Sequence, residues 1–137
     1  MPMPLRGLSV LVVEDDRAHR ELAQDMLTAL GARVTVATNG EEAFALLIAG
    51  GCPDLILCDL RMPLMDGFGF AHVARKYSTS RNVRLVALTA IRDPVASLQT
   101  WSAGYDAHLE KPLTVEKLED LAARLLSGGA ASGAPTT

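Results

Sequence analysis

The sequence has few cysteines, few aromatic residues and no long apolar run. Its 137 residues include 2 cysteines, Cys52 and Cys58, which form neither a Cys-x-x-Cys pair nor a Cys/His metal pattern. This excludes a disulfide framework and indicates a reducing compartment. No apolar stretch approaches the ~20 residues of a membrane span, and residues 1–4 lack the features of a signal peptide. We therefore expect a cytoplasmic protein with no membrane insertion.

Basic residues are also in deficit. Lys and Arg number 13 against 16 Asp and Glu, which gives a formal net charge of −3. This balance lacks the basic footprint of nonspecific nucleic-acid binding, so no nucleic-acid partner is expected. Hydrophobic residues make up 49% and charged residues 21%, as in a folded globular chain. The length fits one domain.

Buried-strand patterns alternate with amphipathic helical patterns along the chain. Strands are predicted at 8–13, 33–37, 54–59, 83–89 and 106–109. Helices are predicted at 17–30, 39–48, 66–74, 94–104 and 114–125, with Asp16, Asn39 and Thr114 as N-caps. Five βα units predict an α/β domain with a doubly wound parallel sheet, and we expect the flavodoxin-like (βα)5 strand order 2-1-3-4-5. We assign residues 1–7 to an N-terminal lead, 8–126 to the domain and 127–137 to a flexible tail.

Chemically active side chains follow four of the five predicted strands. Glu14 and Asp15 follow the first strand, and Asp59 ends the third. Parallel sheets bind ligands at these carboxyl ends, where carboxylates that crowd together need a cation. Oxygen donors without His or Cys favour Mg²⁺. Thr89 ends the fourth strand and Lys111 follows the fifth, which adds a hydroxyl donor and an ammonium. The set predicts a phosphoryl site with an aspartate nucleophile.

At these strand ends the chain resembles a response-regulator receiver domain of two-component signalling, over roughly residues 8–126. Four motifs in order carry the resemblance: Val-Val-Glu14-Asp15, Asp59-Leu-Arg-Met-Pro-Leu-Met-Asp-Gly67, Leu88-Thr89-Ala90 and Lys111-Pro112. A single motif of this kind would be weak support. The occurrence of all four in order, at the ends of four of the five predicted strands, is specific to this family.

The resemblance implies a role for each site residue. Asp59 would accept a phosphoryl group from a phosphohistidine on a sensor histidine kinase or histidine phosphotransfer protein. Asp15 would bind Mg²⁺ directly, Glu14 partly through water, and the backbone carbonyl of Arg61 would be a further ligand. Lys111 would pair with a phosphoryl oxygen.

The resemblance also implies a conformational output. Thr89 would form a hydrogen bond with a phosphoryl oxygen. This would change the conformation of the face formed by the fourth helix, fifth strand and fifth helix, and a downstream protein target would bind that face. The peptide bond before Pro112 would be cis. His108 stands three residues before Lys111, where most receivers have Tyr or Phe, so we hypothesise that it replaces the aromatic switch without abolishing phosphorylation. In the family, the residue two positions beyond the threonine influences how water reaches the acyl phosphate. Ile91 occupies that position here and cannot orient water, so we predict a long-lived phosphoryl state.

Other functions remain open at this stage. A Mg²⁺-dependent aspartyl phosphatase of the haloacid-dehalogenase type needs a second aspartate two residues after the nucleophile, where this chain has Arg61. A flavodoxin-like FMN carrier needs a phosphate loop that the acidic residues 14–16 would repel. A phosphorylation-independent scaffold of receiver fold is a third alternative.

The three histidines of the chain are interpreted as surface or partly packed residues, namely His19, His72 and His108.

Overall fold

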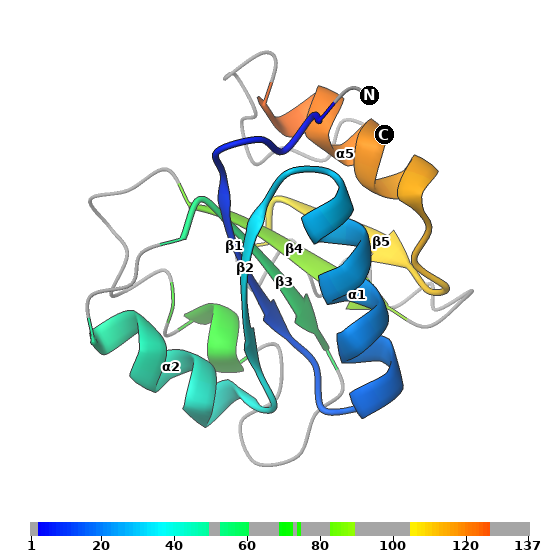
Figure 1. The fold of residues 1–137 in the computed structure, drawn as a ribbon. Helices are drawn as coiled ribbons and strands as arrows, with labels where there is room; N and C mark the ends of the chain where they lie inside the picture. Colours follow the sequence, from blue (N-terminus) through cyan, green and yellow to red (C-terminus); the bar gives the residue numbers. More distant parts are fainter. Residues whose placement is uncertain are drawn as a thin grey trace.

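Five parallel strands form one sheet in the order β2-β1-β3-β4-β5 (Figure 1). The computed structural model describes residues 3–49, 53–60, 69–72, 74, 83–89 and 105–126. The strands are β1 (Ser9–Val13), β2 (Arg33–Ala37), β3 (Leu55–Asp59), β4 (Arg84–Thr89) and β5 (Ala107–Glu110). The order and the parallel pairing confirm the predicted flavodoxin-like sheet.

Three helices are described in full, and each starts at its predicted cap. They are α1 (Arg17–Ala29), α2 (Gly40–Ile48) and α5 (Val115–Leu126). The capping side chains of Asp16, Asn39 and Thr114 accept the backbone N–H three residues on, at 2.8, 2.7 and 3.2 Å. Residues 69–72 and 74 are also helical, within the predicted helix 66–74. The predicted helix 94–104 and the tail 127–137 lie outside the described residues.

Helices cover both faces of the sheet, with α1 and α5 on one face and α2 on the other (Figure 1). Alternate residues of β1 therefore enter two separate cores: Val10 and Val12 pack with α1 and α5, while Leu11 and Val13 pack on the α2 side. Cys58 lies fully buried in the second core, as its alternation with Asp59 predicts. Burial of β1 and β3 on both faces explains their nearly continuous apolar sequences.

The segment before β1 contributes to the first core, although the sequence suggested a lead outside the domain. Leu5 is 1% exposed, and its backbone N–H donates to the carbonyl of Leu30 at 3.0 Å. Gly31 permits this close approach, since a Cβ there would lie 2.9 Å from the Cα of Arg6, and its φ of +101° disfavours other residues. Residues 3–8 thus pack against the end of α1.

Within the described residues, no helix has the length and apolar character needed to span a membrane.

Candidate functional site

The strand register brings the predicted site residues to one edge of the sheet. Val13 of β1 pairs with Cys58 of β3, so the next residues, Glu14 and Asp59, lie side by side at the carboxyl ends of the two strands. Asp59 in turn pairs with Leu88 of β4, which directly precedes Thr89.

Lys111 joins the same edge through β5. Thr89 pairs with Glu110, and the carbonyl of Thr89 accepts the N–H of Lys111 at 2.8 Å. The Lys111–Pro112 peptide bond is cis, the geometry that the resemblance implies. Because all these strands run parallel, four segments distant in sequence deliver their side chains to one place.

Three carboxylates converge at this edge. Glu14, Asp15 and Asp59 each place an oxygen within 4.8 Å of the others. Glu14 is 1% exposed and Asp59 is 8% exposed, whereas Asp15 faces solvent. An oxygen-only donor set with one open side fits a hard divalent cation such as Mg²⁺. Arg61, whose backbone carbonyl was expected to complete this set, lies outside the described residues.

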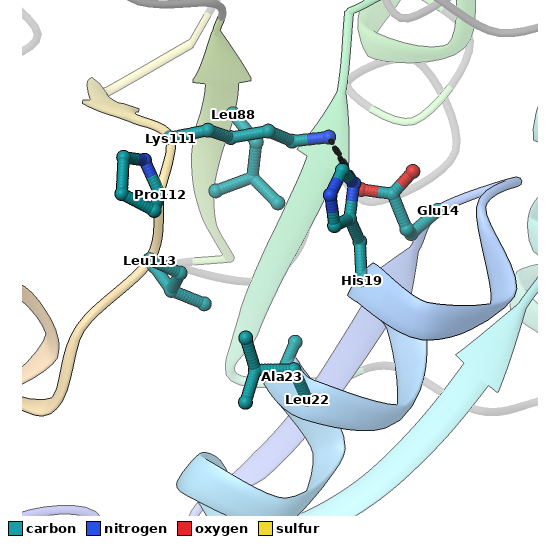
Figure 2. Close-up of a pocket in the computed structure, with 8 residues that line it drawn as sticks. All are labelled: Glu14, His19, Leu22, Ala23, Leu88, Lys111, Pro112 and Leu113. Atoms are coloured by element: carbon teal, nitrogen blue, oxygen red, sulfur yellow. Dashed lines mark hydrogen bonds and ion pairs between the residues drawn. The ribbon is translucent and has the colours of Figure 1, made fainter.

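Lys111 bridges the two buried carboxylates. Its Nζ donates to Glu14 Oε1 at 2.7 Å and to Asp59 Oδ2 at 3.0 Å. Figure 2 shows the lysine side chain extending from the strand end toward Glu14. The ammonium therefore lies among the acidic groups and neutralises part of their charge.

Burial and ion pairing compete at these groups. Burial raises the pKa of Glu14, and the neighbouring Asp59 carboxylate adds to this, while the hydrogen bond from Lys111 acts in the opposite direction. Burial acts to lower the pKa of Lys111, but its hydrogen bonds with Glu14 and Asp59 outweigh burial, so the net pKa is raised. The lysine consequently stays protonated at neutral pH. By formal charge, three carboxylates and one ammonium sum to −2, which a divalent cation would balance.

Thr89 is buried at the end of β4, one residue beyond the partner of Asp59, and is hydrogen-bonded to the neighbouring strand β5. Its side chain is sequestered from solvent, and its Oγ1 donates to the carbonyl of Leu109 in β5 at 3.4 Å. His108, which precedes Leu109 in β5, is half-buried and pairs with Ala87 of β4. Any force that draws the Thr89 hydroxyl toward the acidic site would thus loosen its contact with β5.

Two residues of α1 approach the site although the sequence did not single them out as site residues. His19 Nδ1 lies 3.4 Å from Lys111 Nζ and 3.5 Å from Asp16 Oδ2, and the imidazole stands beside the lysine in Figure 2. Arg20 Nη1 donates to the carbonyls of Glu14 and Asp15 at 3.0 and 3.3 Å. The only sequence signal for either was its place in the first turn of the helix that follows the acidic residues.

An apolar groove of about 180 Å³ adjoins these polar groups. It runs between α1 and the chain after β5, and Leu22, Ala23 and Leu113 line it below Lys111 and His19 (Figure 2). The acidic site therefore opens beside an apolar surface.

A doubly wound parallel sheet with clustered carboxylates, a lysine and a buried threonine at its carboxyl edge defines a receiver-type signalling domain. Comparison with known families gives the same result, because the model of the response regulator receiver domain matches residues 10–123. The chain belongs to this family.

Relatives of known type support the assignment. The chain is 33% identical over 111 residues to two-component response regulator 24 of Arabidopsis thaliana, covering 81% of this chain and 78% of that protein. It is 39% identical over 117 residues to the response regulator MprA of Mycolicibacterium vanbaalenii, covering 85% of this chain but 48% of MprA. The chain thus spans about half the length of that relative.

Among solved structures, a receiver domain of the sensor histidine kinase PA1611 from Pseudomonas aeruginosa superimposes with a TM-score of 0.80 and 30% identity. The match covers 89% of this chain and 99% of that domain, whose structure has a magnesium ion coordinated in the active-site cleft. The family match, the sequence relatives and the similar solved structure agree on the fold and the family of this chain.

Proposed function

We propose that this domain accepts a phosphoryl group on Asp59 from a phosphohistidine of a partner protein and passes the signal on by a change of shape. The observation that carries the proposal is the pairing of Lys111 with Asp59 at 3.0 Å, inside a cluster where Glu14 and Asp15 bring two further carboxylates. The Asp59 carboxylate has the Lys111 ammonium beside it. The neighbouring Asp15 is exposed, so the cluster is open to solvent on that side.

The transfer would proceed as a displacement at phosphorus. An Asp59 carboxylate oxygen forms the new P–O bond while the P–N bond of the phosphohistidine breaks. The departing imidazole keeps the electron pair of that bond and takes a proton from solvent. A carboxylate is a modest nucleophile, so charge neutralisation and alignment supply most of the catalysis. In this sense the domain assists its own phosphorylation.

Glu14, Asp15 and Asp59 would hold Mg²⁺, with the Arg61 carbonyl as a proposed further ligand. The bound ion would supply positive charge to the phosphoryl oxygens. Lys111 contributes a mobile ammonium, which can leave the Asp59 oxygen that it contacts at 3.0 Å and pair with a phosphoryl oxygen. The PA1611 receiver, which carries magnesium in its cleft, supports this part of the proposal.

Thr89 would couple the phosphoryl group to the rest of the domain. Its hydroxyl donates to Leu109 of β5 in the structure, so turning it toward a phosphoryl oxygen gives up that bond. β5 and α5 then belong to the surface that changes, which supports readout by a protein partner. We propose His108, next to Leu109, as a part of this switch: replacing it by Tyr should alter partner affinity and leave labelling of Asp59 unchanged.

The competing functions have less support. The phosphatase alternative lacks its second aspartate, because Arg61 occupies that position. A phosphorylation-independent scaffold has no need for a buried Glu14 and Asp59, whose burial costs free energy. The net charge of −3 favours a protein partner over nucleic acid. The cytoplasmic location and the long phosphoryl lifetime, which depends on Ile91 outside the described residues, stay predictions.

Beryllofluoride, a mimic of an acyl phosphate, tests the proposal. With Mg²⁺ it should shift the NMR signals of Thr89 and Lys111 in the wild type, and Asp59→Asn should abolish the shifts. Asp54→Asn is the matched control, because Asp54 lies at the opposite end of β3, where its Oδ2 accepts the N–H of Ser9 at 2.9 Å. Shifts that persist in Asp59→Asn, or that vanish in Asp54→Asn, would contradict the assignment.

A further inference from the structure

We propose that Arg20 is a positioning residue for the acidic pair: its guanidinium fixes the backbone of Glu14 and Asp15 so that their carboxylates stay arranged for Mg²⁺. This inference rests on the proposed function, since it concerns how the chain prepares the metal site. Arg20 touches neither Asp59 nor Lys111 through any hydrogen bond of the described residues.

The contacts of Arg20 lie on the loop between β1 and α1. Its Nη1 donates to the carbonyl oxygen of Glu14 at 3.0 Å and to that of Asp15 at 3.3 Å. Its backbone N–H donates to the carbonyl of Asp16 at 2.9 Å, the first bond of the helix. One half-buried residue therefore contacts all three residues between the end of β1 and the start of α1.

The loop is held from its other side as well. The N–H of Glu14 donates to Ala37 of β2 at 3.0 Å, and Glu14 Oε2 accepts the N–H of Asp16 at 3.1 Å. Among the described hydrogen bonds, Glu14 thus connects the loop to the sheet, whereas Asp15 is exposed at the turn. The guanidinium Nη1, which donates to two successive carbonyls, limits rotation of the peptide unit that joins Glu14 to Asp15. The relative orientation of the two carboxylates depends on that peptide unit.

Charge and position predict opposite effects when Arg20 is removed. If Arg20 acted only as a positive charge near the acidic cluster, its loss would reduce repulsion of a divalent cation, and Mg²⁺ would bind more tightly. If Arg20 positions the loop, its loss frees the carboxylates before binding, and Mg²⁺ binds more weakly. Removing a residue that holds the metal ligands in place by hydrogen bonds typically weakens metal binding by about 10–100-fold. The sign of the change in Kd therefore separates the two roles.

Arg17 provides a matched control on the same helix. It is exposed and pairs with Glu21 at 3.0 Å, so Arg17→Gln makes the same change in charge without touching the loop carbonyls. Titration calorimetry of the full chain with Mg²⁺ should give a Kd about tenfold weaker for Arg20→Gln. Arg17→Gln should bind as tightly as the wild type or slightly more tightly. Arg20→Lys should fall between, because it keeps the charge but lacks the length and the fixed planar geometry of the guanidinium.

A second measurement needs no metal. Hydrogen exchange of the Asp16 amide, followed by NMR in the presence of a chelator, should be faster in Arg20→Gln and unchanged in Arg17→Gln. If Arg20→Gln folds poorly, the same exchange measurement is made on Arg20→Lys, which is then compared with Arg17→Gln.

The outcomes distinguish this inference from the proposed function. Mg²⁺ binding by Arg20→Gln as tight as that of Arg17→Gln, or unchanged exchange at Asp16, would overturn the positioning role. A wild type that binds no Mg²⁺ would instead overturn the proposed function, and exchange at Asp16 would still decide the role of Arg20 in the loop.

Discussion

Replacing Lys111 by Met tests whether its ammonium compensates the buried carboxylates. The substitution keeps an unbranched chain of similar length and removes the cation that lies 2.7 Å from Glu14 and 3.0 Å from Asp59. Leaving buried carboxylates without their partner costs about 3–5 kcal/mol in a closed interior. Here the Lys111 side chain is 23% exposed and water reaches the site, so we expect about 2 kcal/mol at neutral pH.

At about 4 °C per kcal/mol for a domain of this size, the thermal midpoint should fall by about 8 °C. The assay is thermal unfolding followed by circular dichroism in the presence of a chelator, at about pH 5 and about pH 7.5.

The pH dependence of this loss has a definite sign. Loss of the lysine hydrogen bond removes the main influence that lowers the pKa of Glu14, so in Lys111→Met that pKa rises further above its ordinary value of 4.5. Below 4.5 the carboxyl is protonated in both the folded and the unfolded chain, and its ionisation costs nothing. As pH rises above that value, the unfolded chain releases its proton first, so the free energy of unfolding falls until the pH passes the folded-state pKa. The difference between variant and wild type should therefore be larger at pH 7.5 than at pH 5.

Lys117→Met is the matched control for this measurement. Lys117 Nζ donates to the backbone carbonyls of Glu110 and Pro112 at 2.7 and 2.9 Å and contacts no carboxylate among the described residues. Its replacement should cost the same at both pH values. The reasoning fails if Lys111→Met is as stable as Lys117→Met at neutral pH, or if the cost of Lys111→Met does not change with pH.

Further predictions concern metal binding and stability. Lys111→Met should bind Mg²⁺ more tightly than the wild type in calorimetry, because the competing cation is gone; weaker binding would contradict this. Leu5→Ala should lower the free energy of unfolding in urea by about 2–4 kcal/mol, since the side chain is 1% exposed, whereas Met3→Ala, at 45% exposed, should cost far less. Asn39→Ala should cost about 1 kcal/mol in the same assay by removing the cap bond to Glu42 at 2.7 Å, and an unchanged midpoint would exclude that role.

The strand ends of the site were predictable because parallel strands align their carboxyl ends. Glu14, Asp59 and Thr89 each end or directly follow an apolar run, and Lys111 directly follows the short fifth strand, so locating the strands also locates these residues. The helix caps were predictable for a similar reason, since Asn39 and Asp16 stand immediately before amphipathic stretches. Local pattern and sheet topology together determine these positions.

Other contacts depend on tertiary packing that leaves no local signal. Leu5 is a single leucine between Pro4 and Arg6, so no periodicity marks it as a core residue. Arg20 follows the polar pattern of an exposed helix side, yet its long side chain reaches back to the loop. His19 approaches Lys111 across 92 positions of sequence, a contact that only the packing of α1 against the chain after β5 creates. Side chains that turn away from the face predicted by periodicity are the ones that sequence analysis misses.

The most direct test of the account is the site of phosphorylation itself. The purified chain is incubated with Mg²⁺ and phosphoramidate, a small donor that has a P–N bond like that of phosphohistidine, and intact mass and peptide mapping follow. We predict the gain of one phosphoryl group, located on Asp59, dependent on Mg²⁺ and absent from Asp59→Asn. A phosphoryl group on any other residue, or the same gain in Asp59→Asn, would contradict the account.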